Sequence, residues 1–138
     1  AAIKTWRPRA NFVEQSSNDI WDAICRCCKL VRADTGIDVD DIRGIGFDAT
    51  CSLVLVDAAG NGVSVDPDGS KDKNIIVWMD HRAVRETTEI NSLGEDGYSV
   101  FDYVGGKISP EMQLPKLLWL KRHLPSSWKR AAHFFYLP

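Results

Sequence analysis

Polar residues interrupt a long apolar stretch in the middle of this chain, and this interruption constrains the fold most. Residues 42–47 and 53–57 are largely apolar, and the small or polar residues between them include Asp48, Thr50, Cys51 and Ser52. Such groups are costly to bury unless each finds a hydrogen-bond partner, so they require an internal partner or a polar ligand. A further apolar run, residues 74–79, contains Trp78 and is followed by Asp80 and Arg82. An aromatic face, an acceptor and a forked donor at the end of a strand suit a polyhydroxylated ligand.

The apolar pattern predicts alternating helices and strands. A first helix is predicted over about residues 18–33, because apolar residues recur there at helical spacing. We expect this apolar face to lie in the core; its members are Ile20, Trp21, Ile24, Cys28 and Val31. Further helices are predicted at residues 82–91, 96–104, 116–123 and 128–132, and strands at residues 3–7, 42–47, 53–57, 74–79 and 133–136. Residues 58–62 indicate a hairpin turn leading to a short return strand at 63–65, and residues 66–73 an exposed loop. This alternation indicates an α/β layered domain.

Length, charge and cysteine usage exclude several classes of protein. The 138 residues fit one domain, and a net charge of −2 provides no general attraction to nucleic acid. No apolar run approaches the roughly 20 residues of a membrane span, and no secretory signal is visible, so we expect a cytoplasmic protein. The four cysteines, which we expect to be free thiols, are Cys25, Cys27, Cys28 and Cys51. A cysteine-based metal module stays a remote alternative, because their spacing is not a zinc pattern, and we expect no metal.

Three segments of the chain are distinctive together. They are Gly-Phe-Asp-Ala-Thr-Cys-Ser at 46–52, Trp-Met-Asp-His-Arg at 78–82, and the stretch 105–120 with its Pro-Lys pair at 115–116. These segments resemble the FGGY family of carbohydrate kinases, and most closely its ribulokinase-like branch. The resemblance implies part of a ribonuclease-H-like (actin-like ATPase) domain, with a mixed sheet and flanking helices. It also implies an enzyme that transfers a phosphoryl group from Mg-ATP to a sugar or sugar alcohol, with a pentulose such as ribulose as the expected substrate.

The same resemblance implies which residues hold the sugar. They are Thr50, Cys51, Trp78, Asp80, Arg82, Glu111 and Lys116. Local chemistry leaves simpler roles open for several of them. Thr50 and Cys51 also fit buried strand positions, Asp80 a helix cap, Arg82 a salt bridge, and Lys116 a solvated surface charge.

The family's phosphate-binding loop, catalytic Asp and C-terminal nucleotide domain are expected outside residues 1–138. The chain is therefore expected to be a partial, sugar-binding N-terminal domain with no catalytic residue of its own. We expect it to bind neither ATP nor Mg²⁺ alone and to be inactive alone. A sugar is the expected partner, with no nucleic acid and no membrane, and a homo-oligomer is left open. The alternative function is a non-catalytic sugar-binding or interaction module on the same fold.

Overall fold

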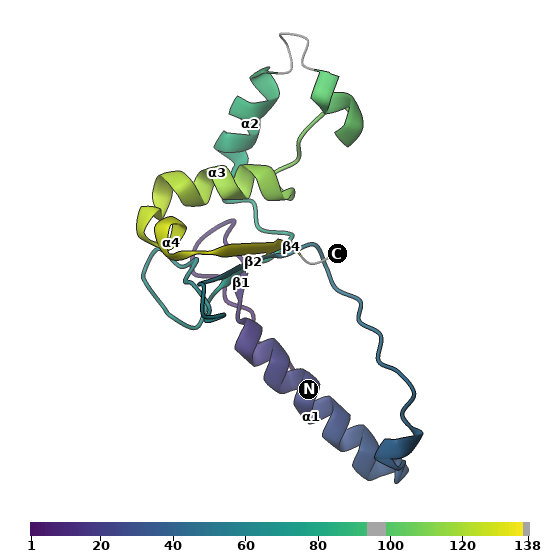
Figure 1. Cartoon of the computed structure of the whole chain (residues 1–138). Helices are drawn as coiled ribbons and strands as arrows, with labels where there is room; N and C mark the ends of the chain where they lie inside the picture. Colours follow the sequence, from purple (N-terminus) through teal and green to yellow (C-terminus); the bar gives the residue numbers. More distant parts are fainter. Residues whose placement is uncertain (94–98, 137–138) are drawn as a thin grey trace.

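The chain folds into one small sheet with helices around it (Figure 1). The computed structural model describes residues 1–93 and 99–136. In chain order the elements are β1 (Glu14–Gln15), α1 (Ser17–Thr35), the short 3₁₀ helix η1 (Val39–Asp41), β2 (Leu53–Val56), β3 (Ile75–Ile76), α2 (Val84–Leu93), the 3₁₀ helix η3 (Ser99–Val104), α3 (Gln113–His123), α4 (Pro125–Arg130) and β4 (His133–Tyr136). The predicted α/β class is confirmed.

The four strands form a sheet in the order β1-β3-β2-β4. Every pairing between these strands is antiparallel, although a mixed sheet was expected. Leu53 is paired with Ile76 on one side and with Tyr136 on the other. This register brings the end of β3 and the end of β4 to the point where the chain enters β2.

The core lies between the sheet and α3. Its fully buried members include Leu53 and Leu55 of β2, Ile76 of β3 and Leu120 of α3, while Trp119 is 7 % exposed. Helices α3 and α4 cover one face of the sheet, and α2 packs on α3 (Figure 1).

The first helix begins and ends where its capping residues predict. The Ser16 side chain accepts a hydrogen bond from the backbone N–H of Asp19, and Gly36 closes the helix with φ +67°. A glycine tolerates this left-handed conformation without steric cost. The predicted helix 96–104 is found only as the 3₁₀ helix η3, and its residues 96–98 lie outside the described residues.

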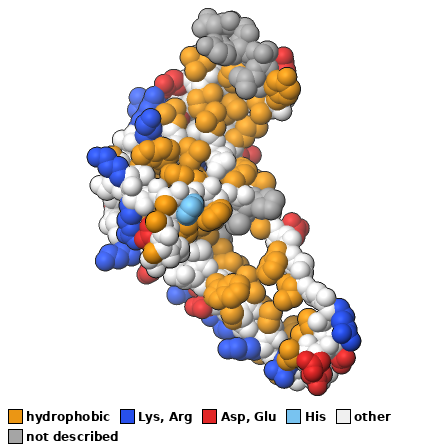
Figure 2. Space-filling view, viewed as in Figure 1, with side chains coloured by type: hydrophobic (Ala, Val, Ile, Leu, Met, Phe, Trp, Pro, Cys, Tyr) orange, Lys and Arg blue, Asp and Glu red, His pale blue; other side chains and the backbone are white. Residues whose placement is uncertain are grey.

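The predicted strand at 42–47 and the predicted buried face of α1 are wrong. Residues 42–51 are extended without strand pairing, and Ile45 and Phe47 are each 74 % exposed. Trp21 and Val31 of α1 are about 60 % exposed, because the helix projects away from the sheet (Figures 1 and 2). A strand forms only where a neighbour supplies backbone partners, and no described residue supplies them to this segment. The predicted strand at residues 3–7 is reduced to one bridge at Trp6 for the same reason.

The described helices also bear on membrane insertion. None of those in residues 1–93 and 99–136 is both long enough and apolar enough to cross a bilayer.

Candidate sugar-binding site

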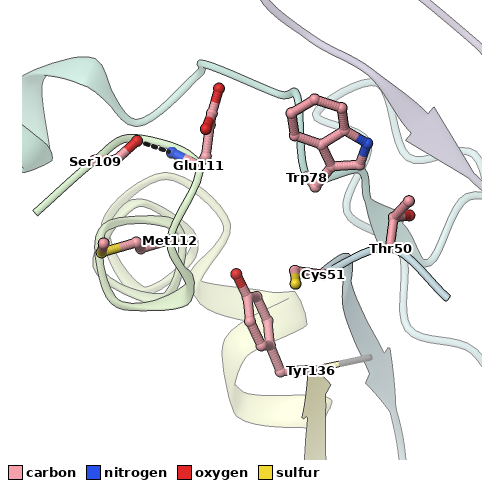
Figure 3. A pocket seen from close by; sticks show the side chains of 7 residues that line it. All are labelled: Thr50, Cys51, Trp78, Ser109, Glu111, Met112 and Tyr136. Atoms are coloured by element: carbon pink, nitrogen blue, oxygen red, sulfur yellow. Dashed lines mark hydrogen bonds between the residues drawn. The ribbon is translucent and has the colours of Figure 1, made fainter. Parts of the chain in front are cut away.

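A pocket of about 380 Å³ opens at the end of the sheet where β2 begins (Figure 3). It is lined by Thr50, Cys51, Trp78, Ser109, Glu111, Met112 and Tyr136. Four of these residues, Thr50, Cys51, Trp78 and Glu111, were predicted from the sequence. They come from segments that are far apart in the chain, and the fold brings them together.

Ser52 fixes the wall formed by Thr50 and Trp78. Its buried hydroxyl accepts a hydrogen bond from the backbone N–H of Trp78 at 3.2 Å and lies 3.4 Å from the hydroxyl of Thr50. The polar interruption in the apolar stretch therefore has two outcomes. Ser52 is satisfied within the protein, whereas Thr50 and Cys51 face the pocket.

Glu111 is held on the opposite wall by two neighbours. The Ser109 hydroxyl accepts a hydrogen bond from the backbone N–H of Glu111 at 3.2 Å (Figure 3). One carboxylate oxygen of Glu111 lies 3.1 Å from Nε2 of His81. The carboxylate side chain is still 45 % exposed, so it has lone pairs free to accept from a ligand.

Tyr136 lines the pocket although the sequence did not single it out. Its ring lies across the cavity from the indole of Trp78, with its hydroxyl near Cys51 in the view of Figure 3. Burial raises the pKa of the phenol, and the neighbouring Cys51 and Glu111 raise it further. Tyr136 ends an apolar strand, so its pattern indicated only a strand residue. Tyr136 reaches the pocket because β4 pairs with β2, and this pairing between distant segments cannot be inferred from the local sequence.

Lys116 lies behind the pocket and not in its lining. Its side chain is fully buried, and Nζ donates to the carbonyl oxygens of Val77 at 3.0 Å, Trp78 at 2.9 Å and Glu111 at 3.0 Å. Burial is the largest cause that lowers the pKa of Lys116, which falls to about 8.

Asp80 and Arg82 also lie behind the pocket lining, in a buried network of charges. Asp80 accepts from the backbone N–H of Val13 at 2.6 Å and from Nε of Arg82 at 2.9 Å. The Arg82 guanidinium donates to an oxygen of Glu14 at 2.9 Å and to the carbonyl of Val65 at 2.9 Å. Both charged side chains have no exposed surface, so neither offers a free polar atom to a ligand.

The guanidinium of Arg82 is enclosed by aromatic rings as well. It lies 4.1 Å from the ring centre of Phe12 and 5.0 Å from that of Trp119. Glu14, which no local pattern pointed to, completes the network, and burial is the largest cause that raises its pKa. Its other oxygen has no hydrogen-bond donor among the described residues, and the ammonium of Lys73 lies 3.6 Å from it.

The lining combines the groups that a polyhydroxylated ligand needs. Two aromatic side chains supply flat apolar surfaces for C–H faces, and Thr50, Ser109 and Glu111 supply hydroxyl and carboxylate groups for the ligand's own hydroxyls. Within residues 1–93 and 99–136, no three His, Cys, Asp or Glu side chains gather as they would around a metal ion. The four cysteines are free thiols, with Cys51 in the pocket wall.

The fold is that of sugar kinases. A structure described as a xyloylose kinase from Brucella ovis superposes with a TM-score of 0.77, at 23% identity, over 97% of this chain and 26% of that one. A gluconate kinase from Lactobacillus acidophilus superposes with a TM-score of 0.74, at 20% identity, over 98% of this chain and 25% of that one.

The chain belongs to the FGGY family of carbohydrate kinases, since the family's N-terminal domain matches residues 1–137. An FGGY carbohydrate kinase domain-containing protein of Homo sapiens is 50% identical over 137 residues, which are 99% of this chain and 24% of the relative. D-ribulokinase YDR109C of Saccharomyces cerevisiae is 49% identical over 138 residues, which are 99% of this chain and 19% of the relative. The chain thus spans a quarter or less of these relatives, and the predicted resemblance is confirmed.

Proposed function

We propose that the protein containing this domain is an ATP-dependent carbohydrate kinase whose substrate is a pentulose such as ribulose. The observation that supports this best is the pocket itself, which places two aromatic rings and several polar groups around a cavity of about 380 Å³ on an FGGY domain. The similarity to D-ribulokinase favours ribulose among the candidate sugars.

In this proposal the pocket residues bind and orient the sugar. The rings of Trp78 and Tyr136 cover its carbon skeleton. Its hydroxyls are contacted by the Tyr136 hydroxyl and by Thr50, Cys51, Ser109 and Glu111. Asp80, Arg82 and Lys116 were predicted to contact the sugar, but their polar atoms are bonded to the protein. We therefore assign them supporting roles behind the pocket wall. Holding the acceptor hydroxyl in one orientation is a large part of catalysis in phosphoryl transfer.

The described lining of this pocket includes no Lys or Arg that could bind the phosphates of ATP. Phosphate groups need cations with free donors, and the two cations behind this pocket, Arg82 and Lys116, have theirs engaged by Asp80, Glu14 and backbone carbonyls. We propose that ATP, Mg²⁺ and the catalytic base are held by parts of the protein beyond residues 1–138.

The proposal predicts activity for the full-length protein and none for residues 1–138 alone. ADP release should be measured for both proteins with ribulose, xylulose and glycerol as acceptors. We expect sugar-dependent ADP release from the full-length protein only, with the highest kcat/KM for ribulose. A full-length protein that binds ribulose without releasing ADP would instead support a sugar-binding module.

Tyr136→Phe in the full-length kinase tests the pocket residue that the sequence did not reveal. Loss of one hydroxyl contact costs about 0.5–1.5 kcal/mol, which predicts a roughly two- to tenfold rise in the sugar KM and an unchanged ATP KM. Tyr103→Phe is the matched control, because Tyr103 is 88% exposed and lies outside the pocket lining. Equal sugar KM values for Tyr136→Phe and the wild type would show that the hydroxyl makes no contact.

A further inference from the structure

Lys116 is a buried cation in an unusual position. It lies in the first turn of α3, where the positive end of the helix dipole disfavours a lysine. Its side chain has no exposed surface. A buried charge is costly unless it is fully hydrogen-bonded, so the bonds that it makes must compensate for this position.

The three carbonyl groups around the ammonium belong to two different walls of the pocket. Val77 and Trp78 directly follow β3 and carry the indole wall, whereas Glu111 lies in the segment before α3 and carries the carboxylate wall. Trp78 and Glu111 are separated by more than thirty positions in the chain. One ammonium group therefore bridges the two walls directly.

The ammonium has no donor left for a ligand. It carries three N–H groups, and each is matched by one carbonyl at about 3 Å. We infer that Lys116 is a positioning residue, whose ammonium ties the backbone that carries Trp78 to the backbone that carries Glu111 and so fixes the width of the pocket. The inference rests on the proposed function only for the identity of the ligand.

The hydrogen bonds that link the two pocket walls depend on the protonation state of Lys116. Burial lowers its pKa to about 8, a change that Arg82 reinforces and that Asp80, Glu111 and Cys51 oppose. A neutral amine keeps only two N–H groups, so one of the three carbonyls loses its donor when the proton leaves. Raising the pH through about 8 should therefore loosen the pocket before the fold itself is lost.

The first test measures the tie itself, with or without a known substrate. Amide hydrogen exchange of the full-length protein is compared between the wild type, Lys116→Met and Lys121→Met, which changes an exposed lysine of the same helix. We expect Lys116→Met alone to speed exchange in peptides covering 77–79 and 109–113, with β2 unchanged. Unchanged exchange in both segments would overturn the inference.

The second test measures the consequence for the sugar. Loss of a charged hydrogen bond predicts a roughly ten- to hundredfold rise in the sugar KM of Lys116→Met, with the ATP KM unchanged. For the wild type, the sugar KM should rise above about pH 8, and Lys116→Arg, whose guanidinium stays charged, should abolish this rise. The rise should persist in Cys51→Ala, which removes the thiol from the pocket wall.

The outcomes separate this inference from the proposed function. If the wild-type protein phosphorylates no sugar but the expected exchange pattern is found, the proposed kinase activity is refuted and the role of Lys116 in linking the two pocket walls is supported. If the protein is a kinase but Lys116→Met has the same sugar KM as the wild type, the linking role of Lys116 is refuted. A wild-type sugar KM that does not change with pH refutes it as well. The pH profile needs no substitution, so the inference is testable even if Lys116→Met does not fold.

Discussion

Arg82→Leu is expected to destabilise the folded chain more than any other single change of a charged residue. The substitution leaves the carboxylates of Asp80 and Glu14 buried without the guanidinium that pairs with both. Breaking a buried ion pair by removing one partner typically costs about 3–5 kcal/mol, which is a large share of the roughly 5–15 kcal/mol that holds a domain folded. Urea unfolding followed by circular dichroism should show a correspondingly lower midpoint.

Arg9→Leu is the matched control for this prediction. Arg9 also pairs with a carboxylate, Asp68 at 2.7 Å, and also lies over the ring of Phe12, at 5.7 Å. Its side chain is 49% exposed, however, and an exposed pair contributes about 0–1 kcal/mol. Similar urea midpoints for Arg9→Leu and Arg82→Leu would show that the buried network is not what stabilises this domain.

The sequence predicted the pocket only where local pattern and chemistry coincide. Thr50 and Cys51 interrupt an apolar stretch, and Trp78 is a large aromatic residue near the end of another apolar run, so each can be recognised within its own segment. Tyr136 reaches the pocket only because β4 pairs with β2 in one register, which no local pattern specifies. Glu14 was missed for the same reason, because its partner Arg82 lies far along the chain.

The residues behind the pocket differ from those in its lining in burial and in hydrogen bonding. Asp80, Arg82 and Lys116 belong to segments that resemble the family's sugar site, but a motif does not distinguish a side chain that touches the ligand from one that supports it. The side chains of all three are buried and hydrogen-bonded within the protein, which favours the supporting role proposed above. A buried cation with every donor bonded inside the protein is best explained as support.

The fold was predictable where helices have strong caps and was not where a strand depends on a partner. Ser16 and Gly36 define the limits of α1 locally, within one turn at each end. The segment 42–47 has the composition of a strand, but strand formation needs a neighbouring backbone that the described residues do not supply. Its apolar side chains, such as Ile45, are consequently exposed.

Trp78→Ala is expected to have the largest effect on sugar use by the full-length kinase. A large aromatic anchor in a binding site commonly contributes enough that its removal lowers kcat/KM roughly ten- to a hundredfold. We expect that loss for the sugar and an unchanged KM for ATP, measured by steady-state kinetics with each substrate varied in turn. Trp21→Ala is the control, because Trp21 is 60% exposed on α1 and outside the pocket lining.

This substitution isolates the indole because the backbone of Trp78 makes the structural contacts. Its N–H donates to Ser52 and its carbonyl accepts from Lys116, and an alanine keeps both bonds. The residue is 37% exposed, so its truncation should cost less stability than that of a core residue such as Trp119, which is 7% exposed. A selective loss of sugar use would therefore measure the ring's contact with the sugar, whereas equal kinetics for Trp78→Ala and the wild type would move the sugar out of this pocket.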